Sequence, residues 1–308
     1  MSLLLKKYLE ENLIQVKFNY FIYEIIRSKK GTLLAFTAIM FITPDSLLIR
    51  LSNVDSWNLI FYRGLVPFVT VFIGLLIIKK SNFFHSIIEN GWHGVGYILT
   101  FIITNILFVH SIENTNVANT LVMVSLAPML SAIISFIFLK EYPDKKTWIA
   151  ITITTLAVIY IFIDSFEKGD VQGNVYGFIC AMGLAAGAVI IRAGKKSSNL
   201  IPSAMTAKLI IALICLFFVD DLSIKGNDLF IIPTMCIFCV AIPFVLITLA
   251  PRYITAAEVN LFFLLETVLG PFWVWLVIKE QPSIETIIGG GVIIITIAAH
   301  SFLALKKT

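Results

Sequence analysis

Long apolar runs alternate with short polar connections along almost the whole chain after residue 30. A bilayer core is about 30 Å thick, so a helix needs roughly 20 mainly apolar residues to cross it. Ten runs approach that length, and no connection between them is long enough to form a domain. The runs cover residues 32–51, 57–78, 93–112, 116–139, 147–163, 174–192, 202–219, 229–250, 256–278 and 286–305. The pattern predicts an all-α polytopic membrane protein with ten transmembrane helices.

Residues 1–30 carry a different pattern, which predicts neither a signal peptide nor a span. Acidic residues interrupt the segment, and no small-residue cleavage site follows it. Apolar side chains recur at helical spacing from Leu9 to Tyr23, while Glu10, Lys17 and Glu24 lie on another face. We expect an amphipathic helix in the cytoplasmic membrane interface, with a disordered tail as the alternative.

The apolar pattern repeats along the chain, which indicates an internal duplication. Residues 110–143 align with residues 249–282 without a gap, at a constant offset of 139. Lys140-Glu141 thereby falls on Lys279-Glu280, and the prolines two positions further on also coincide. We interpret the chain as two copies of one ancestral unit.

The first run has a repeat as well, at an offset of 142, so that Arg50 corresponds to Arg192. The two halves, residues 31–163 and residues 174–305, therefore contain five runs each. Because five is odd, the halves enter the membrane in opposite directions. The sequence predicts two inverted five-helix repeats, an arrangement that places a binding site near the midplane between the halves.

Composition and charge place these repeats in a membrane. Hydrophobic residues make up 58% of the 308 residues and charged residues only 14%, compared with about a quarter in soluble proteins. If the N-terminus is cytoplasmic, 17 lysines and arginines lie on the inner side and 4 on the outer side. The positive-inside rule then places both termini in the cytoplasm, and we expect a bacterial inner membrane protein. Because almost all cations lie at the span ends, the charge gives no basis for nucleic-acid binding.

Five ionisable side chains lie within the predicted spans, where an unpaired charge is expensive: Asp45, Arg63, Lys208, Glu258 and Glu266. A helical rise of about 1.5 Å per residue places Asp45 and Arg63 at a similar depth on the outer side. The same count places Lys208 and Glu258 together on the inner side. We predict an ion pair in each case, acting either as a structural clamp or as a gate that forms and breaks.

Glu266 has no expected partner at its depth, and desolvation favours the protonated form of such a carboxyl group. We interpret it as a proton carrier or a counter-charge for a cationic substrate, or else as a protonated group bonded to a neighbouring helix. Asn105, Asn119 and Asn260 are candidates for hydrogen bonds to a substrate, and each also suits contacts between helices. Trp273 is a candidate cavity aromatic, because an aromatic face attracts an ammonium group.

Glycine and proline positions predict how the helices approach and where they break. Gly183-x-x-x-Gly187 allows close helix packing, and Gly289-Gly290-Gly291 suggests a similar contact, at a homodimer surface if not within the chain. Pro44, Pro128, Pro243 and Pro271 can interrupt helices within the spans and free carbonyl groups toward a cavity. Pro44, beside Asp45, is the position where we expect a break.

Other chemistries lack the residues that they need. Cys236-x-x-Cys239 has the spacing of a zinc or redox motif, but it lies within a span and has no second ligand pair. The histidines do not cluster, so we expect neither a metal nor a cofactor. A membrane enzyme or lipid-handling protein would need a catalytic cluster, and a receptor would need a long loop. A channel stays open as an alternative to a transporter.

The two five-span halves resemble the EamA-type transporters of the drug/metabolite transporter superfamily. The resemblance covers about residues 31–305 and also includes Arg63 in the sequence FYRG and the turns that contain Glu141 and Glu280. The sequence APRYITAAEVN before the ninth run fits it as well. It implies ten helices around a central cavity and secondary transport of small metabolites.

From the residues and the resemblance we predict a non-enzymatic transporter for a small polar metabolite, working by alternating access as a monomer or homodimer. An amino acid or amine is the preferred substrate, because both charge signs occur within the membrane. Glu266 would couple protons or balance substrate charge, and Arg63 would hold a carboxylate or close the outer gate. Export of drugs or nucleotide-like compounds is the alternative. The expected partners are the substrate, protons and membrane lipid.

Overall fold

The computed structural model describes residues 29–77, 83–140, 142, 145–168, 170–193, 200–250, 253 and 256–305, which form helices, turns and irregular connections without any strand. The predicted interfacial helix of residues 1–30 lies outside this part of the chain, except for residues 29 and 30. The predicted all-α class is therefore confirmed for the described residues.

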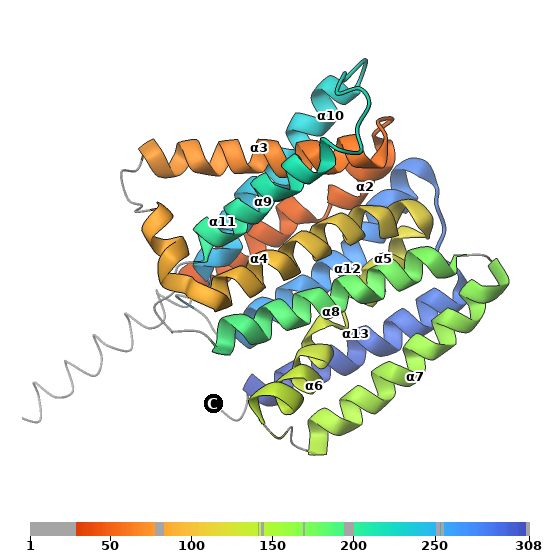
Figure 1. Ribbon diagram of the computed structural model, residues 1–308. Helices are drawn as coiled ribbons and strands as arrows, with labels where there is room; N and C mark the ends of the chain where they lie inside the picture. Colours follow the sequence, from red (N-terminus) through yellow and green to blue (C-terminus); the bar gives the residue numbers. More distant parts are fainter. Residues whose placement is uncertain are drawn as a thin grey trace, which may run out of the picture.

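The helices of the first half follow the predicted runs (Figure 1). The first run forms a helix over residues 29–42 and then a separate short helix after Pro44. The labelled helices are α2 (Asp45–Leu51), α3 (Ser56–Ile77), α4 (Phe83–Asn114), α5 (Val117–Val124), α6 (Ala127–Leu139) and α7 (Lys145–Lys168). The fourth run thus holds two helices, α5 and α6.

The helices of the second half also follow the predicted runs, and one of these runs is divided into three helical segments. Its helices are α8 (Val171–Ala193), α9 (Ile201–Cys215), α10 (Asp228–Thr234), the π-helix η1 (Met235–Ala241), α11 (Ile242–Leu249), α12 (Ala256–Ile278) and α13 (Ile284–Leu305). The eighth run therefore contains α10, η1 and α11 in succession. A π-helix within an α-helical segment commonly marks a functional region.

Helix length and composition support an integral membrane protein. Seven helical stretches of the described chain are long and apolar enough to cross a membrane. Three further apolar stretches, within α9, α12 and α13, are shorter: Ile201–Cys215, Leu265–Ile278 and Ile284–His300. A count of ten full spans therefore stays a prediction.

Two of the four prolines considered above lie in or beside a turn that separates two helices, and a third lies where a π-helix continues into an α-helix. Thr43 and Pro44 form a turn that separates residues 29–42 from α2, as expected. A turn before Pro128 separates α5 from α6, and Pro243 lies in the first turn of α11, directly after the π-helix. Pro271, in contrast, lies inside the continuous helix α12.

Each extensive helix contact pairs one helix of the first half with one of the second. α4 packs on α8, α3 on α9, and α7 on α13, while α5 packs on α12 (Figure 1). The largest apolar core draws on both halves and includes Leu59, Ile112, Ile211 and Met235. The two halves therefore share one core between them.

Glycines permit the closest of these contacts. A Cβ atom on Gly183 would lie 2.6 Å from Thr104 Cγ2 of α4, so the predicted close approach at this motif is present. On α13, Gly289 faces Ile161 of α7 and Gly290 faces Val122 of α5. These two glycines thus serve packing within the chain, whereas Gly291 faces open space, and the suggested homodimer contact stays a prediction.

Lys140 and Lys279 adopt the same unusual backbone conformation at equivalent places in the two halves. Their φ angles are 55° and 60°, and no other non-glycine residue in the described ranges has a positive φ. Lys140 ends α6 and Lys279 follows α12. A left-handed residue after a helix is a common terminator. The duplication seen in the sequence is therefore visible in the backbone.

Candidate functional site

A buried ion pair joins α2 and α3 within the first half. Arg63 Nη1 lies 2.6 Å from Asp45 Oδ1, and Arg63 Nη2 lies 2.8 Å from Asp45 Oδ2. The break at Pro44 makes Asp45 the first residue of α2, which turns its carboxylate toward α3. The Asp45 side chain is only 5% exposed and the Arg63 side chain only 9%. The ion pair expected between these residues is thus present in the structure.

Lys208 lies on α9 and contacts α4. Its Nζ donates a hydrogen bond to Asn105 Oδ1 at 2.6 Å and lies 5.7 Å from the centre of the Phe101 ring. Asn105 in turn donates its amide to the backbone carbonyl of Phe101. The side chains of Glu258 and Asn260 lie outside the described part of the structure. The predicted Lys208–Glu258 pair therefore stays a prediction.

Glu266 lies on α12, where it is partly buried. Its carboxyl group lies within electrostatic range of Asp45 and Arg63, and the buried thiol of Cys180 lies within range of it. Among the described residues, none forms a hydrogen bond or ion pair with the Glu266 carboxyl group. The role of Glu266 therefore stays a prediction.

Asp45, Arg63, Lys208 and Glu266 form what we call the central charge cluster. Lys208 and Glu266 each lie within electrostatic range of the Asp45–Arg63 pair. The first half contributes the pair, which is already neutralised internally. The second half contributes one cation and one carboxyl group without a described partner of opposite charge. The cluster therefore brings charged groups of both signs, from both halves, into one region of the helical core.

Two other predicted site residues make contacts between helices. Asn119 donates to Thr115 Oγ1 at 3.1 Å and accepts a hydrogen bond from the hydroxyl of Thr286 on α13. Trp273 Nε1 donates to Thr43 Oγ1, at the turn between the first helix and α2. Asn119 thus makes a contact between helices, which was the alternative to substrate binding. Trp273 binds the turn between the first helix and α2, two residues before Asp45.

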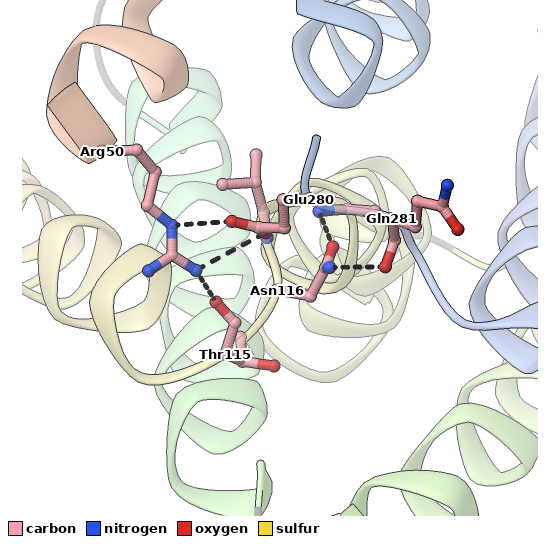
Figure 2. A network of polar contacts seen from close by, with 7 residues as sticks. Arg50, Thr115, Asn116, Glu280 and Gln281 are labelled. Carbon is pink, nitrogen blue, oxygen red and sulfur yellow. Dashed lines mark hydrogen bonds and ion pairs between the residues drawn. The ribbon is translucent and has the colours of Figure 1, made fainter. Parts of the chain in front are cut away.

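The residues after α12 join the first half through contacts that the sequence reasoning missed (Figure 2). Arg50 Nε lies 3.2 Å from Glu280 Oε2, and Glu280 Oε1 accepts a hydrogen bond from the backbone N–H of Val117 at 2.8 Å. Asn116 Nδ2 donates to the backbone carbonyl of Gln281. We call these five residues the end network.

Arg50 also binds within its own half, since its Nη2 donates to the carbonyl of Thr115 at 2.6 Å. A cavity of about 340 Å³ adjoins the network. It is lined by Arg50, Glu113, Asn114, Thr115, Asn116, Asp170 and Glu280. The only signal for this site in the sequence was the repeated Lys-Glu turn, which marked Glu280 without indicating its partners.

The loop between α9 and α10 crosses to the first half at the same end of the molecule. Asn58 Nδ2 donates to the carbonyl of Asp221 at 2.7 Å, and the carboxylate of Asp228 accepts from the backbone N–H of Asn53. The Ser223 hydroxyl and backbone N–H both donate to the Asp221 carboxylate. These bonds lower the pKa of Asp221 below its ordinary value, because they stabilise the charged form.

Comparison with known proteins supplies independent evidence. A family model described as "EamA-like transporter family" matches residues 29–163 and again residues 171–302. A search of curated proteins finds no match. A solved structure titled only "Crystal structure of protein" has 15% sequence identity and a TM-score of 0.65, and the alignment covers 90% of this chain and 98% of that chain. At this identity the likeness shows the fold.

Proposed function

Because the chain belongs to the EamA-like transporter family, within the drug/metabolite transporter superfamily, we propose that it moves a small polar metabolite across the membrane by alternating access. The observation that carries this proposal is the central charge cluster, to which both halves contribute. Charged groups inside a membrane protein are expensive and commonly mark a substrate or ion pathway. In duplicated transporters such a site lies between the halves.

The charges of the cluster favour a zwitterionic substrate such as an amino acid, with an amine as the next class. Arg63 is held by both oxygens of Asp45, so we assign the role of binding a substrate carboxylate to Lys208 instead. Glu266 is proposed as the counter-charge for the substrate ammonium group. The alternative for Glu266 is proton coupling, which the experiment below separates from substrate binding.

The charge distribution also supports an orientation. With 17 cations on one side and 4 on the other, both termini are proposed to lie in the cytoplasm. The repeats of residues 31–163 and 174–305 are proposed to form a ten-span protein in a bacterial inner membrane.

A thermal-shift screen of the purified protein against separate pools of amino acids, amines and monocarboxylic acids tests this function. A ligand at a hundred times its dissociation constant stabilises the folded state by about 2.7 kcal/mol. We expect a zwitterion to stabilise the natural protein, and each of the variants Glu266→Gln and Lys208→Gln to lose most of that shift. Asp220→Asn, in the exposed loop before α10, is the matched control and should keep it.

The outcomes divide the alternatives cleanly. A shift that survives Glu266→Gln but becomes independent of pH would assign Glu266 to proton coupling. A shift produced by amines alone would remove Lys208 from the site. The absence of a shift from every pool would contradict the proposed substrate class.

A further inference from the structure

The end network connects the two halves at one end of the molecule. The turns after α2, α4, α7, α9 and α12 all lie at this end, toward the right in Figure 1. Arg50, Asn116 and Val117 belong to the first half, whereas Glu280 and Gln281 belong to the second. Any motion that separates the halves here must therefore break the contacts of Glu280 with Arg50 and Val117, and that of Asn116 with Gln281.

Glu280 is the centre of these contacts. Val117 is the first residue of α5, so its N–H has no acceptor within the helix and points along the positive end of the helix dipole. Glu280 binds this N–H and the Arg50 guanidinium at the same time (Figure 2). Both interactions depend on the negative charge of Glu280, so neutralising that one residue weakens the whole connection.

The backbone explains why Glu280 reaches across. The left-handed conformation of Lys279 ends α12 and redirects the next residue away from the helix axis. Asn116 meets it from the other half, where its Oδ1 accepts from the N–H of Ala118 and caps α5. The network is therefore built on two helix termini that face each other across the boundary between the halves.

The contacts are suited to opening and closing. The side chains of Arg50 and Glu280 are 24% and 21% exposed, and the adjoining cavity of about 340 Å³ is lined by polar groups. Water can therefore replace the lost hydrogen bonds when the halves separate. The pair is partly exposed and therefore easier to separate than the buried Asp45–Arg63 pair, because water can reach its charges.

We propose that the end network is a charge-dependent gate, closed in this structure, that seals one end of the pathway to the central charge cluster. The proposal rests on the alternating access of the proposed function. In this proposal Glu280 holds the two halves together at this end, and it does so by binding Arg50 and the first N–H group of α5.

The experiment measures accessibility rather than transport, so it does not depend on finding the substrate. Cys236 is buried in η1 and lies within electrostatic range of Arg63 and Lys208. In sealed vesicles of each orientation, the rate at which a membrane-impermeant maleimide labels Cys236 is measured for the natural protein, Glu280→Gln and Arg50→Gln. Cys236→Ser gives the background from the other thiols.

We expect Glu280→Gln and Arg50→Gln to raise the labelling rate several-fold from the side that carries the end network, and from that side alone. Gln281→Ala is the matched control, because only the backbone carbonyl of Gln281 takes part in the network, and its rate should not change. Thermal unfolding confirms that each variant is folded.

Two results would overturn the gate. Unchanged labelling in both folded variants would show that the network does not limit access to the cluster. Labelling that rises equally from both sides would show a general loosening of the fold. Failure of the substrate screen, in contrast, leaves these labelling rates interpretable and bears on the proposed substrate alone.

Discussion

Two ion pairs in this protein both join an arginine to a carboxylate, but they differ in burial and in the parts of the chain that they connect. The Asp45–Arg63 pair has side chains only 5% and 9% exposed, with two hydrogen bonds, and both residues lie in the first half. The Arg50–Glu280 pair has side chains 24% and 21% exposed and joins one half to the other. The first pair connects neighbouring helices of one half, whereas the second must break if Glu280 moves away from Arg50.

This difference separates the two roles that an ion pair within a membrane protein can have. A buried pair with two hydrogen bonds is costly to break, because each charge would then be left in a poorly solvated place. The geometry therefore favours a structural clamp for Asp45–Arg63 over the gating alternative. The partly exposed Arg50–Glu280 pair joins the two halves and is easier for water to reach than the buried pair, as a gate requires.

The largest expected effect concerns the buried pair. Asp45→Asn removes the carboxylate and leaves the Arg63 guanidinium buried without its partner, so we expect unfolding to become easier by about 3–5 kcal/mol. Replacing both residues with apolar ones, Asp45→Leu with Arg63→Met, should destabilise the protein less than Asp45→Asn alone. Denaturant unfolding in detergent micelles measures both, and an equal or larger loss in the double variant would contradict the clamp.

An intermediate effect is expected where the halves meet without any charge. A Cβ atom on Gly64 of α3 would lie 2.7 Å from the carbonyl oxygen of Lys208 on α9, so Gly64→Ala forces these helices apart. Overpacking of this kind costs about 1–3 kcal/mol. Gly74, also in α3, has open space, and Gly74→Ala should instead gain up to about 1 kcal/mol from helix propensity. Melting temperatures that shift in the same direction would contradict the close contact.

The smallest effect on stability is expected at the partly exposed Arg50–Glu280 pair. Glu280→Gln should change the free energy of unfolding by less than about 1 kcal/mol, because solvent screens the interaction. Raising the ionic strength should reduce the difference between Glu280→Gln and the natural protein, since salt screens exposed charges more than buried ones. A loss as large as that of Asp45→Asn would place Glu280 among the structural residues.

The helical class and the Asp45–Arg63 pair could be predicted because both depend on position along a helix. Counting residues gives the depth of a side chain, and adjacent helices of one half bring equal depths together. The hydrogen bond from Lys208 to Asn105 could not be found in this way, because depth does not say which face of a helix meets which neighbour. That choice depends on packing between distant segments.

The end network was missed for a related reason. Two of its contacts use backbone groups, the N–H of Val117 and the carbonyl of Gln281, which have no signature in the pattern of side chains. Pro271 shows the converse error, since a residue that often ends a helix lies inside one here. The neighbouring turns of α12 and the helices packed on it keep the segment helical.

The left-handed lysines show which constraints survived gene duplication. Lys140 and Lys279 share a backbone geometry that a β-branched residue resists and glycine or asparagine accepts. In the proposed inverted arrangement, Lys279 lies on the side expected to be poor in cations. Lys279 lies 5.7 Å from the centre of the Trp275 ring, an attraction that compensates for its placement. The backbone geometry at this position is therefore the same in both repeats, whereas the side chains around the lysine differ between them.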